Sequence, residues 1–152
     1  MAAAVWAGQL LLRYWGGGFW AREATMFLYA KYWAGLFCLL GHMFPCMFRF
    51  RGGKGILSGG TLAILIDWRI ALVVWGGFLL LAILTKYVSL GSVWAGASFP
   101  FATWACYPCL PIVVLAFIIG GLVVWQHRGN IKSLLSGTES KFSFHHKKEG
   151  TR

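Results

Sequence analysis

The clearest pattern along the chain is a series of long apolar stretches separated by short polar segments. Five such stretches can be drawn, at residues 2–12, 24–41, 56–84, 88–104 and 112–125. A helix that crosses a bilayer needs about 20 apolar residues, and about 17 is near the lower limit. The pattern therefore predicts an all-α, polytopic integral membrane bundle of about six membrane helices, some of them short.

The third stretch, Ile56–Leu84, has 29 residues, with Asp67 and Arg69 in its middle. It forms either one steeply tilted helix or two short helices that turn at Asp67. Two charges at mid-span would cost several kcal/mol unless they were paired. The position of these charges favours two helices.

Composition supports the membrane class. Of the 152 residues, 59% are hydrophobic and 12% are charged, whereas a soluble domain has about 25% charged residues. This excludes a soluble enzyme, a nucleic-acid-binding domain and a secreted disulfide scaffold. The net charge of +10 indicates loops that face the cytoplasm or sites for anionic substrates, with membrane lipids as neighbours and no nucleic acid partner.

Basic residues cluster in two places, at Arg49–Lys54 and from Arg128 to the end of the chain. The positive-inside rule places both clusters, and hence the C-terminus, on the cytoplasmic side of the membrane. If residues 56–84 form two crossings, the segments 42–55, 85–92 and 126–141 converge on that face. We expect one domain over residues 1–141, with residues 142–152 as a flexible basic tail near anionic lipid.

The first of these segments contains Gly52, Gly53, Lys54 and Gly55, directly before a predicted helix. Glycines let successive backbone N–H groups point at an anion, and a helix N-terminus adds partial positive charge. It is not a nucleotide-binding loop of the Walker type, because Gly55 stands where Ser or Thr would bind magnesium. The alternative is a flexible basic loop. His42, at the end of the preceding helix, is a weaker candidate.

The other two segments carry Lys86 with Ser89, and His127 with Asn130. Ser89 and Lys86 can donate to a phosphate, although hydroxyl residues at a turn also cap helices. His127 and Asn130 lie one helical turn apart, in a segment that otherwise reads as a juxtamembrane basic run. With the first segment they place seven cations on one face: Arg49, Arg51, Lys54, Lys86, Arg128, Lys132 and Lys141.

The sequence predicts neither a metal site nor a cofactor. Cys106 and Cys109 have the CxxC spacing, but no second pair accompanies them. We interpret them as small apolar residues in a turn broken by Pro108, with a redox or metal role as the alternative. The His-x-x-x-x-Asp motif of better-known membrane acyltransferases is absent, since Met47 and Lys132 stand five positions after His42 and His127.

Three segments in this order resemble one bacterial family, the membrane acyl-phosphate:glycerol-3-phosphate acyltransferases of phospholipid synthesis. The matching segments are Gly41–Gly55, Thr85–Ser92 and His127–Lys141, and the resemblance covers residues 1 to 141. It implies transfer of an acyl group from acyl phosphate to the 1-hydroxyl of glycerol 3-phosphate, which gives lysophosphatidic acid and inorganic phosphate.

The resemblance also implies residue roles. Gly52, Gly53, Lys54 and Gly55 would hold a phosphate, while Ser89, His127 and Asn130 would bind or orient glycerol 3-phosphate. His127 would be the best side chain for proton transfer, with a substrate phosphate oxygen as the alternative.

The front of the chain departs from the family pattern. Members begin with a further span and a glycine-rich loop that carries substrate-binding Ser and Arg, and Gly16–Gly18 does not replace this loop. Residues 1–12 look like the span that follows it, so we expect an N-terminally incomplete member or a chain that cannot act alone. Two other classes stay open: a transporter or binding subunit for phosphorylated solutes, and an inactive membrane protein.

Overall fold

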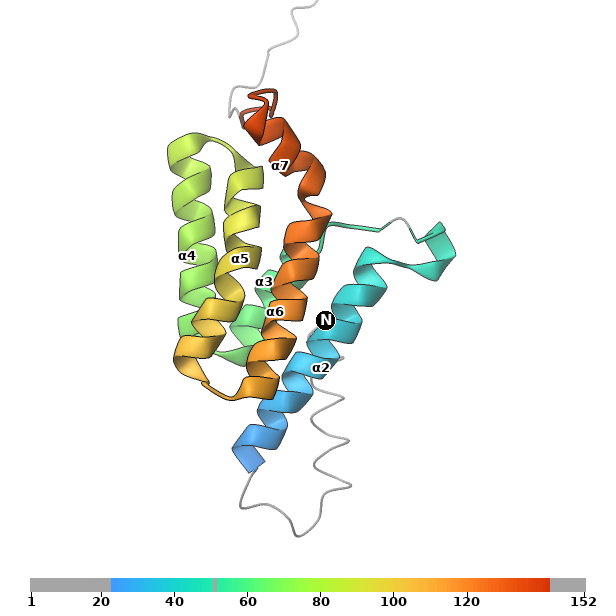
Figure 1. Ribbon diagram of the computed structural model, residues 1–152, viewed down its shortest axis with the longest axis vertical. Coiled ribbons are helices and arrows are strands. Elements are labelled where there is room, and N and C mark those ends of the chain that lie inside the picture. The colour runs from blue at the N-terminus through green and yellow to red at the C-terminus, as the bar shows by residue number, and fades with distance from the viewer. Residues whose placement is uncertain (1–22, 51, 143–152) are drawn as a thin grey trace, which may run out of the picture.

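The computed structural model describes residues 23–50 and 52–142, and the regular structure in these ranges is helical, as expected (Figure 1). The predictions for residues 2–12, Gly16–Gly18, Arg51 and the tail beyond Phe142 lie outside the described residues. The elements are α2 (Glu23–Met43), the 3-10 helix η2 (Cys46–Phe48), α3 (Ile56–Ile66), α4 (Trp68–Thr85), α5 (Val88–Cys106), α6 (Leu110–Gln126) and α7 (Arg128–Leu135).

The long apolar stretch breaks at Asp67, as its charges predicted. Asp67 has extended backbone angles (φ −161°, ψ 135°), and its carboxylate accepts a hydrogen bond from the backbone N–H of Arg69 at 2.8 Å. The same carboxylate pairs with the Arg69 guanidinium at 2.9 Å and accepts a 2.6 Å bond from the Tyr107 hydroxyl. The two charges are thus paired with each other at the turn between α3 and α4.

The two helices on either side of this break differ in length. Helix α3 has 11 residues, which is about 16 Å at 1.5 Å per residue, and this is about half the hydrocarbon core of a bilayer. Helix α4 has 18 residues and is long and apolar enough to cross a membrane by itself. The break is therefore confirmed, whereas α3 is shorter than a complete crossing requires.

From α2 to α6 consecutive helices run antiparallel and side by side, with tertiary contacts between each pair, whereas α7 continues from α6 at a 56° bend (Figure 1). The indole N–H of Trp75 in α4 donates to the carbonyl of Gly60 in α3 at 3.1 Å. In the same way Trp94 in α5 donates to Val73 in α4 at 3.3 Å. Helix α5 in turn packs closely on α6, where a Cβ added at Gly120 would collide with the carbonyl of Gly96. Small residues at such crossings let helix backbones approach closely in a membrane bundle.

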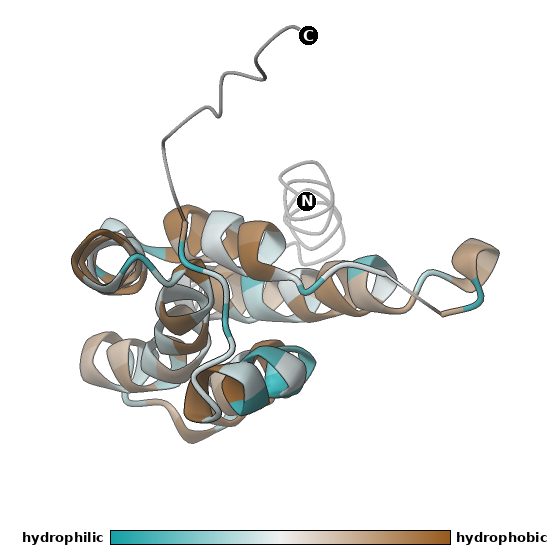
Figure 2. Ribbon diagram, turned by 90° about the horizontal axis from the view of Figure 1, so that it is seen from above, coloured by the Kyte–Doolittle hydropathy of each residue, from teal (hydrophilic) through white to brown (hydrophobic). Residues whose placement is uncertain are grey.

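Much of the outer surface is apolar. Only 17% of α4 is buried inside the bundle, and large side chains such as Leu72, Leu80 and Ile83 are exposed. Figure 2 shows brown, hydrophobic residues on outward as well as inward faces of the helices. Among the described residues one helix passes the test for a spanning helix, and a second passes if α6 and α7, bent by 56°, count as one span.

Candidate functional site

The three sequence segments that were expected to converge meet at one end of the bundle, near the top in Figure 1. The amino group of Lys54 donates to Oδ1 of Asn130 at 2.6 Å. The amide nitrogen of Asn130 donates in turn to Oγ of Ser89 at 2.9 Å. Lys54 precedes α3, Ser89 is in the first turn of α5 and Asn130 is in α7, so one amide joins residues from all three segments.

A fourth residue, Glu139, completes this cluster and was not among the sequence candidates. Its carboxylate accepts a 2.9 Å bond from the Asn130 amide nitrogen and a bond from the Ser89 hydroxyl. These two hydrogen bonds lower the pKa of Glu139 below its ordinary value, and Lys54 adds to the effect. Ser89 and Asn130 thus both donate to the same anionic oxygen, Oε1 of Glu139. We call Lys54, Ser89, Asn130 and Glu139 the polar cluster.

The glycine loop is arranged differently from the expected anion nest. The N–H groups of Gly52 and Gly53 donate to the carbonyls of Met43 and His42, at 3.1 and 3.2 Å. They therefore satisfy carbonyls that the C-terminus of α2 leaves without intrahelical partners, and in this structure they are not directed at a ligand. Lys54 is the loop residue whose side chain reaches the polar cluster.

The absence of a side chain at Gly53 and at Gly55 has a steric or conformational explanation in each case. The His42 ring lies against Gly53, and a Cβ at position 53 would collide with its Nε2. Gly55 adopts a left-handed conformation with φ 78° directly before α3, which a side chain would strain. His42 is thus tied to the loop through Gly53.

His127 stands at the bend between α6 and α7 and is 2% exposed. Its Nδ1 lies 2.8 Å from the carbonyl oxygen of Val123. Because a carbonyl only accepts, Nδ1 carries the proton, and in the neutral ring Nε2 keeps its lone pair. Burial lowers the pKa of His127, and the charge of Lys54 lowers it further, although the bond to Val123 acts in the opposite direction. The ring is therefore neutral near pH 7 and can accept a proton at Nε2.

Lys86 lies in the turn between α4 and α5 with φ 59°, and its side chain is exposed. Its carbonyl accepts a 2.8 Å bond from the backbone N–H of Phe142, and Lys141 lies 5.7 Å from the ring centroid of Tyr87. The chain after α7 therefore returns to the α4–α5 turn and brings Glu139 to Ser89. Lys86 borders the polar cluster through this contact, and Phe142, expected in the flexible tail, is held in place.

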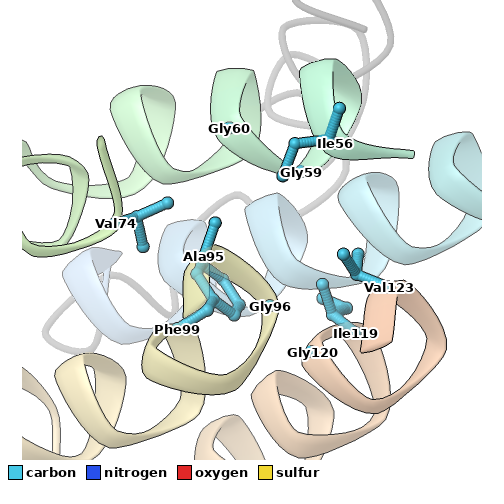
Figure 3. A pocket seen from close by; sticks show the side chains of 10 residues that line it. All are labelled: Ile56, Gly59, Gly60, Val74, Ala95, Gly96, Phe99, Ile119, Gly120 and Val123. Atoms are coloured by element: carbon cyan, nitrogen blue, oxygen red, sulfur yellow. The ribbon is translucent and has the colours of Figure 1, made fainter. Parts of the chain in front are cut away.

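An apolar cavity lies among α3, α4, α5 and α6, on the bundle side of the polar cluster. It is small, with a volume of about 20 Å³, which is room for about one water molecule. The side chains of Ile56, Val74, Ala95, Phe99, Ile119 and Val123 surround it, with Gly59, Gly60, Gly96 and Gly120 in its walls (Figure 3). Ile56 is two positions after Lys54, and Val123 is the residue whose carbonyl binds His127.

At the opposite end of α3 from Lys54, Cys106 and Cys109 are free thiols at the edge of the apolar core. They flank Tyr107, whose hydroxyl binds Asp67. The redox or metal alternative for this pair gains no further support from these contacts.

Comparison with known proteins gives a consistent picture. A family model described as glycerol-3-phosphate acyltransferase matches residues 2–137. A glycerol-3-phosphate acyltransferase of Fusobacterium nucleatum is 38% identical over 110 residues, covering 72% of this chain and 57% of that protein. One of Pseudomonas putida is 37% identical over 124 residues, covering 80% and 64%. The chain thus spans a little over half of the length of the curated relatives it matches.

Two crystal structures of PlsY, an integral membrane glycerol 3-phosphate acyltransferase, have a similar fold. The glycerol 3-phosphate form has a TM-score of 0.73 and 28% identity, and the match covers 90% of this chain and 64% of that one. The lysophosphatidic acid form has a TM-score of 0.74 and 27% identity, with 92% and 67% covered.

Proposed function

Since the chain belongs to the glycerol-3-phosphate acyltransferase family, we propose that it transfers an acyl group from an acyl phosphate to the 1-hydroxyl of glycerol 3-phosphate. The products are lysophosphatidic acid and inorganic phosphate. The observation that carries this proposal is the hydrogen-bonded chain Lys54–Asn130–Ser89, in which three distant segments supply one cation and two neutral donors. That set of donors suits a phosphate dianion.

We assign the phosphate of glycerol 3-phosphate to Lys54, Ser89 and Asn130. Ser89 and Asn130 already bind the carboxylate of Glu139, so a phosphate would compete with Glu139 for these donors. The roles of Gly52, Gly53, Gly55, Lys86 and His42 in holding a phosphate stay predictions. For Gly52 and Gly53 this role requires that their N–H groups leave the α2 carbonyls.

His127 is the residue we assign to proton transfer. The 1-hydroxyl oxygen attacks the acyl carbonyl carbon, the bond from that carbon to the phosphate oxygen breaks, and the hydroxyl proton goes to Nε2 of His127. The depressed pKa of His127 keeps this nitrogen unprotonated at neutral pH. Most of the catalysis would come from positioning the two substrates and from stabilising negative charge.

The chain is an integral membrane protein like its structural relatives. We propose that the polar cluster faces the cytoplasm, because Arg128 and Lys132 in α7 lie at the same end as Lys54 and basic residues stay on the cytoplasmic side. The bacterial inner membrane then supplies the acyl phosphate laterally. The six membrane helices predicted from sequence belong to this proposal, with α3 as a short member.

The test is acyl transfer by membranes of cells that express this chain, with acyl phosphate and labelled glycerol 3-phosphate. Lysophosphatidic acid should form with the chain, and formation should drop strongly with Asn130→Ala. Lys54→Ala should lower formation as well. Its matched control is Lys31→Ala, which removes a lysine of α2 away from the polar cluster. Membranes that neither form lysophosphatidic acid nor bind glycerol 3-phosphate would contradict the proposal, and uptake of phosphate esters without transfer would favour a transporter.

A further inference from the structure

We propose that the turn at residues 45–50 is a membrane anchor whose partner is the surface of an anionic lipid leaflet. Its apolar side chains, Met47, Phe48 and Phe50, enter the boundary between lipid headgroups and acyl chains, and Arg49 binds anionic headgroups there. We call residues 45–50 the anchor turn. This inference goes beyond the proposed function, because it concerns neither substrate of acyl transfer and its test needs no turnover.

The anchor turn is ordered by its backbone and not by apolar packing. The carbonyl of Pro45 accepts hydrogen bonds from the N–H groups of Phe48 and Phe50, at 3.1 and 3.0 Å. Arg49 and Phe50 both have left-handed backbone angles, with φ 53° and 59°, a region that residues other than glycine adopt infrequently. The bonds from the glycine loop to the end of α2 close the base of the turn. Its shape is therefore fixed without burial of its side chains.

Three large apolar side chains of the anchor turn are exposed. Met47 is 88% exposed, Phe48 70% and Phe50 65%, and the described helix η2 has no buried residue. Contact of such side chains with water is unfavourable in proportion to their apolar area. An apolar patch of this kind, within one turn, marks an interaction surface.

The position of the anchor turn indicates that this surface meets lipid. In Figure 1 the turn projects sideways beyond the end of α2, and in Figure 2 it is brown and lies away from the other described helices. Lys54, four positions after Phe50, belongs to the polar cluster, which lies at one end of the bundle. Charged groups of a membrane bundle gather outside the hydrocarbon core. The turn therefore lies beside the bundle at the height of the lipid–water interface.

The charges around the anchor turn identify the kind of lipid. Residues 24–66 contain no acidic residue and four basic ones, namely Lys31, Arg49, Arg51 and Lys54. The side chain of Arg49 is exposed and stands between two exposed phenylalanines. A guanidinium matches the geometry of a phosphate, and basic residues next to a membrane are attracted to anionic headgroups. Apolar side chains that enter the interface beside such cations are typical of segments that bind anionic lipid.

The test uses the thiol of Cys46, which is exposed in the anchor turn, whereas the other three cysteines are half-buried. With those three changed to alanine, a fluorophore on Cys46 reports its surroundings in the full chain, held in nanodiscs of phosphatidylcholine and phosphatidylglycerol. Iodide quenches a fluorophore in water, and lipids with a nitroxide near the start of an acyl chain quench one at the interface. We expect strong quenching by the nitroxide lipids and weak quenching by iodide. The same fluorophore at Ser136→Cys, an exposed position after α7, is the reference for water.

A pair of phenylalanine variants tests the apolar contacts. Phe48→Ser should raise the iodide quenching constant at Cys46 by about two-fold, because less apolar area then holds the turn in the interface. Phe37→Ser removes a phenylalanine of α2 that is also exposed, by 63%, and should leave the quenching of Cys46 unchanged.

A second set of variants tests the preference for anionic lipid. At equal amounts, phosphatidylglycerol that carries the nitroxide should quench Cys46 more than phosphatidylcholine that carries it. Arg49→Gln should lower this preference about three-fold, which is of the order that one basic residue contributes at an anionic surface. Arg49→Lys, which retains the charge, should keep the preference. Lys31→Gln also removes one charge, twelve residues before the end of α2, and should leave it unchanged.

Strong iodide quenching of Cys46, equal to that of the Ser136→Cys reference, would place the turn in water and overturn the inference. Weak quenching by both iodide and nitroxide lipids would mean that protein covers the turn, which also refutes it. The inference is wrong as well if Phe48→Ser matches Phe37→Ser, or if Arg49→Gln matches Lys31→Gln, in variants whose circular dichroism equals that of the parent. These measurements do not depend on acyl transfer, so the proposed function and the anchor turn can fail separately.

Discussion

The amino group of Lys54 lies 2.6 Å from Oδ1 of Asn130, although 76 positions of the sequence separate the two residues. The contact joins the loop before α3 to helix α7. Asn130 uses its other end, the amide nitrogen, for Ser89 and Glu139. A single amide therefore orients a cation, a hydroxyl and a carboxylate at the proposed substrate site.

Removal of the Lys54 charge should weaken phosphate binding. We expect Lys54→Ala to cost about 1.5–3 kcal/mol in the binding of glycerol 3-phosphate, as for a hydrogen bond to a charged group. Titration with labelled glycerol 3-phosphate measures this, with Lys31→Ala as the control. A loss of less than half that size would favour the alternative, in which Lys54 belongs to a flexible basic loop without a binding role.

Lys54 and Asn130 should act as a unit. In a double-mutant cycle of Lys54→Ala and Asn130→Ala, the two effects on kcat/KM should fall short of additivity by about 0.5–3 kcal/mol, because each change already breaks the shared contact. Pairing Lys54→Ala with Tyr107→Phe, at the other end of α3, should give additive effects. Additivity in the first cycle would mean that the 2.6 Å contact has no role in the reaction.

His127 should impose an acid limb on the reaction. Its pKa is below the ordinary value of about 6.5, so the base form persists at neutral pH and kcat/KM should fall only as the pH drops below about 6.5. His127→Gln should lower kcat/KM and abolish this limb, whereas His42→Gln should keep it.

The lowered pKa of His127 also predicts how the free energy of unfolding changes with pH. Below about 6.5 the unfolded chain binds a proton at His127 before the folded one does. The free energy of unfolding should therefore decrease as the pH falls through this region, and His127→Gln should remove that part of the decrease. Unfolding in detergent micelles at several pH values tests this, and a His127→Gln curve with the same slope as the parent would contradict it.

The Asp67 turn should matter for stability and not for catalysis. The hydroxyl of Tyr107 donates to a carboxylate that is only 9% exposed, so Tyr107→Phe should cost about 1.5–3 kcal/mol of unfolding free energy. The KM for glycerol 3-phosphate should stay unchanged, because α3 separates Asp67 from Lys54. Tyr87→Phe keeps the ring that Lys141 contacts and serves as the control; an equal loss in both variants would refute the assignment to Asp67.

The sequence predicted those features that follow from the cost of placing polar groups in an apolar environment. Two charges inside a largely apolar stretch of 29 residues had to be paired or placed at a turn, and the helix break at Asp67 is confirmed. Alternation of apolar stretches likewise brought Lys54, Ser89 and Asn130 to one end, where they are bonded to one another.

Other features depend on contacts that composition does not encode. The return of the chain after α7, which brings Glu139 to Ser89 and Phe142 to Lys86, follows from pairwise hydrogen bonds in a polar segment without periodicity. Its one sequence signal was the glycine, Gly137, which adopts φ 70° two positions before Glu139. The orientation of the Gly52 and Gly53 N–H groups depends on the carbonyls that the end of α2 presents to them. It could therefore not be predicted from the sequence either.

The bond from the Phe142 N–H to the Lys86 carbonyl also makes the proposed substrate site depend on residues that follow the helical bundle. Helices α4, α5 and α6 pack against one another through contacts that need no residue after α7. Ser89 in the first turn of α5, by contrast, binds Glu139. That contact requires the chain after α7 to return to the α4–α5 turn. A chain truncated before Glu139 should therefore keep the apolar bundle and lose the carboxylate that Ser89 and Asn130 bind.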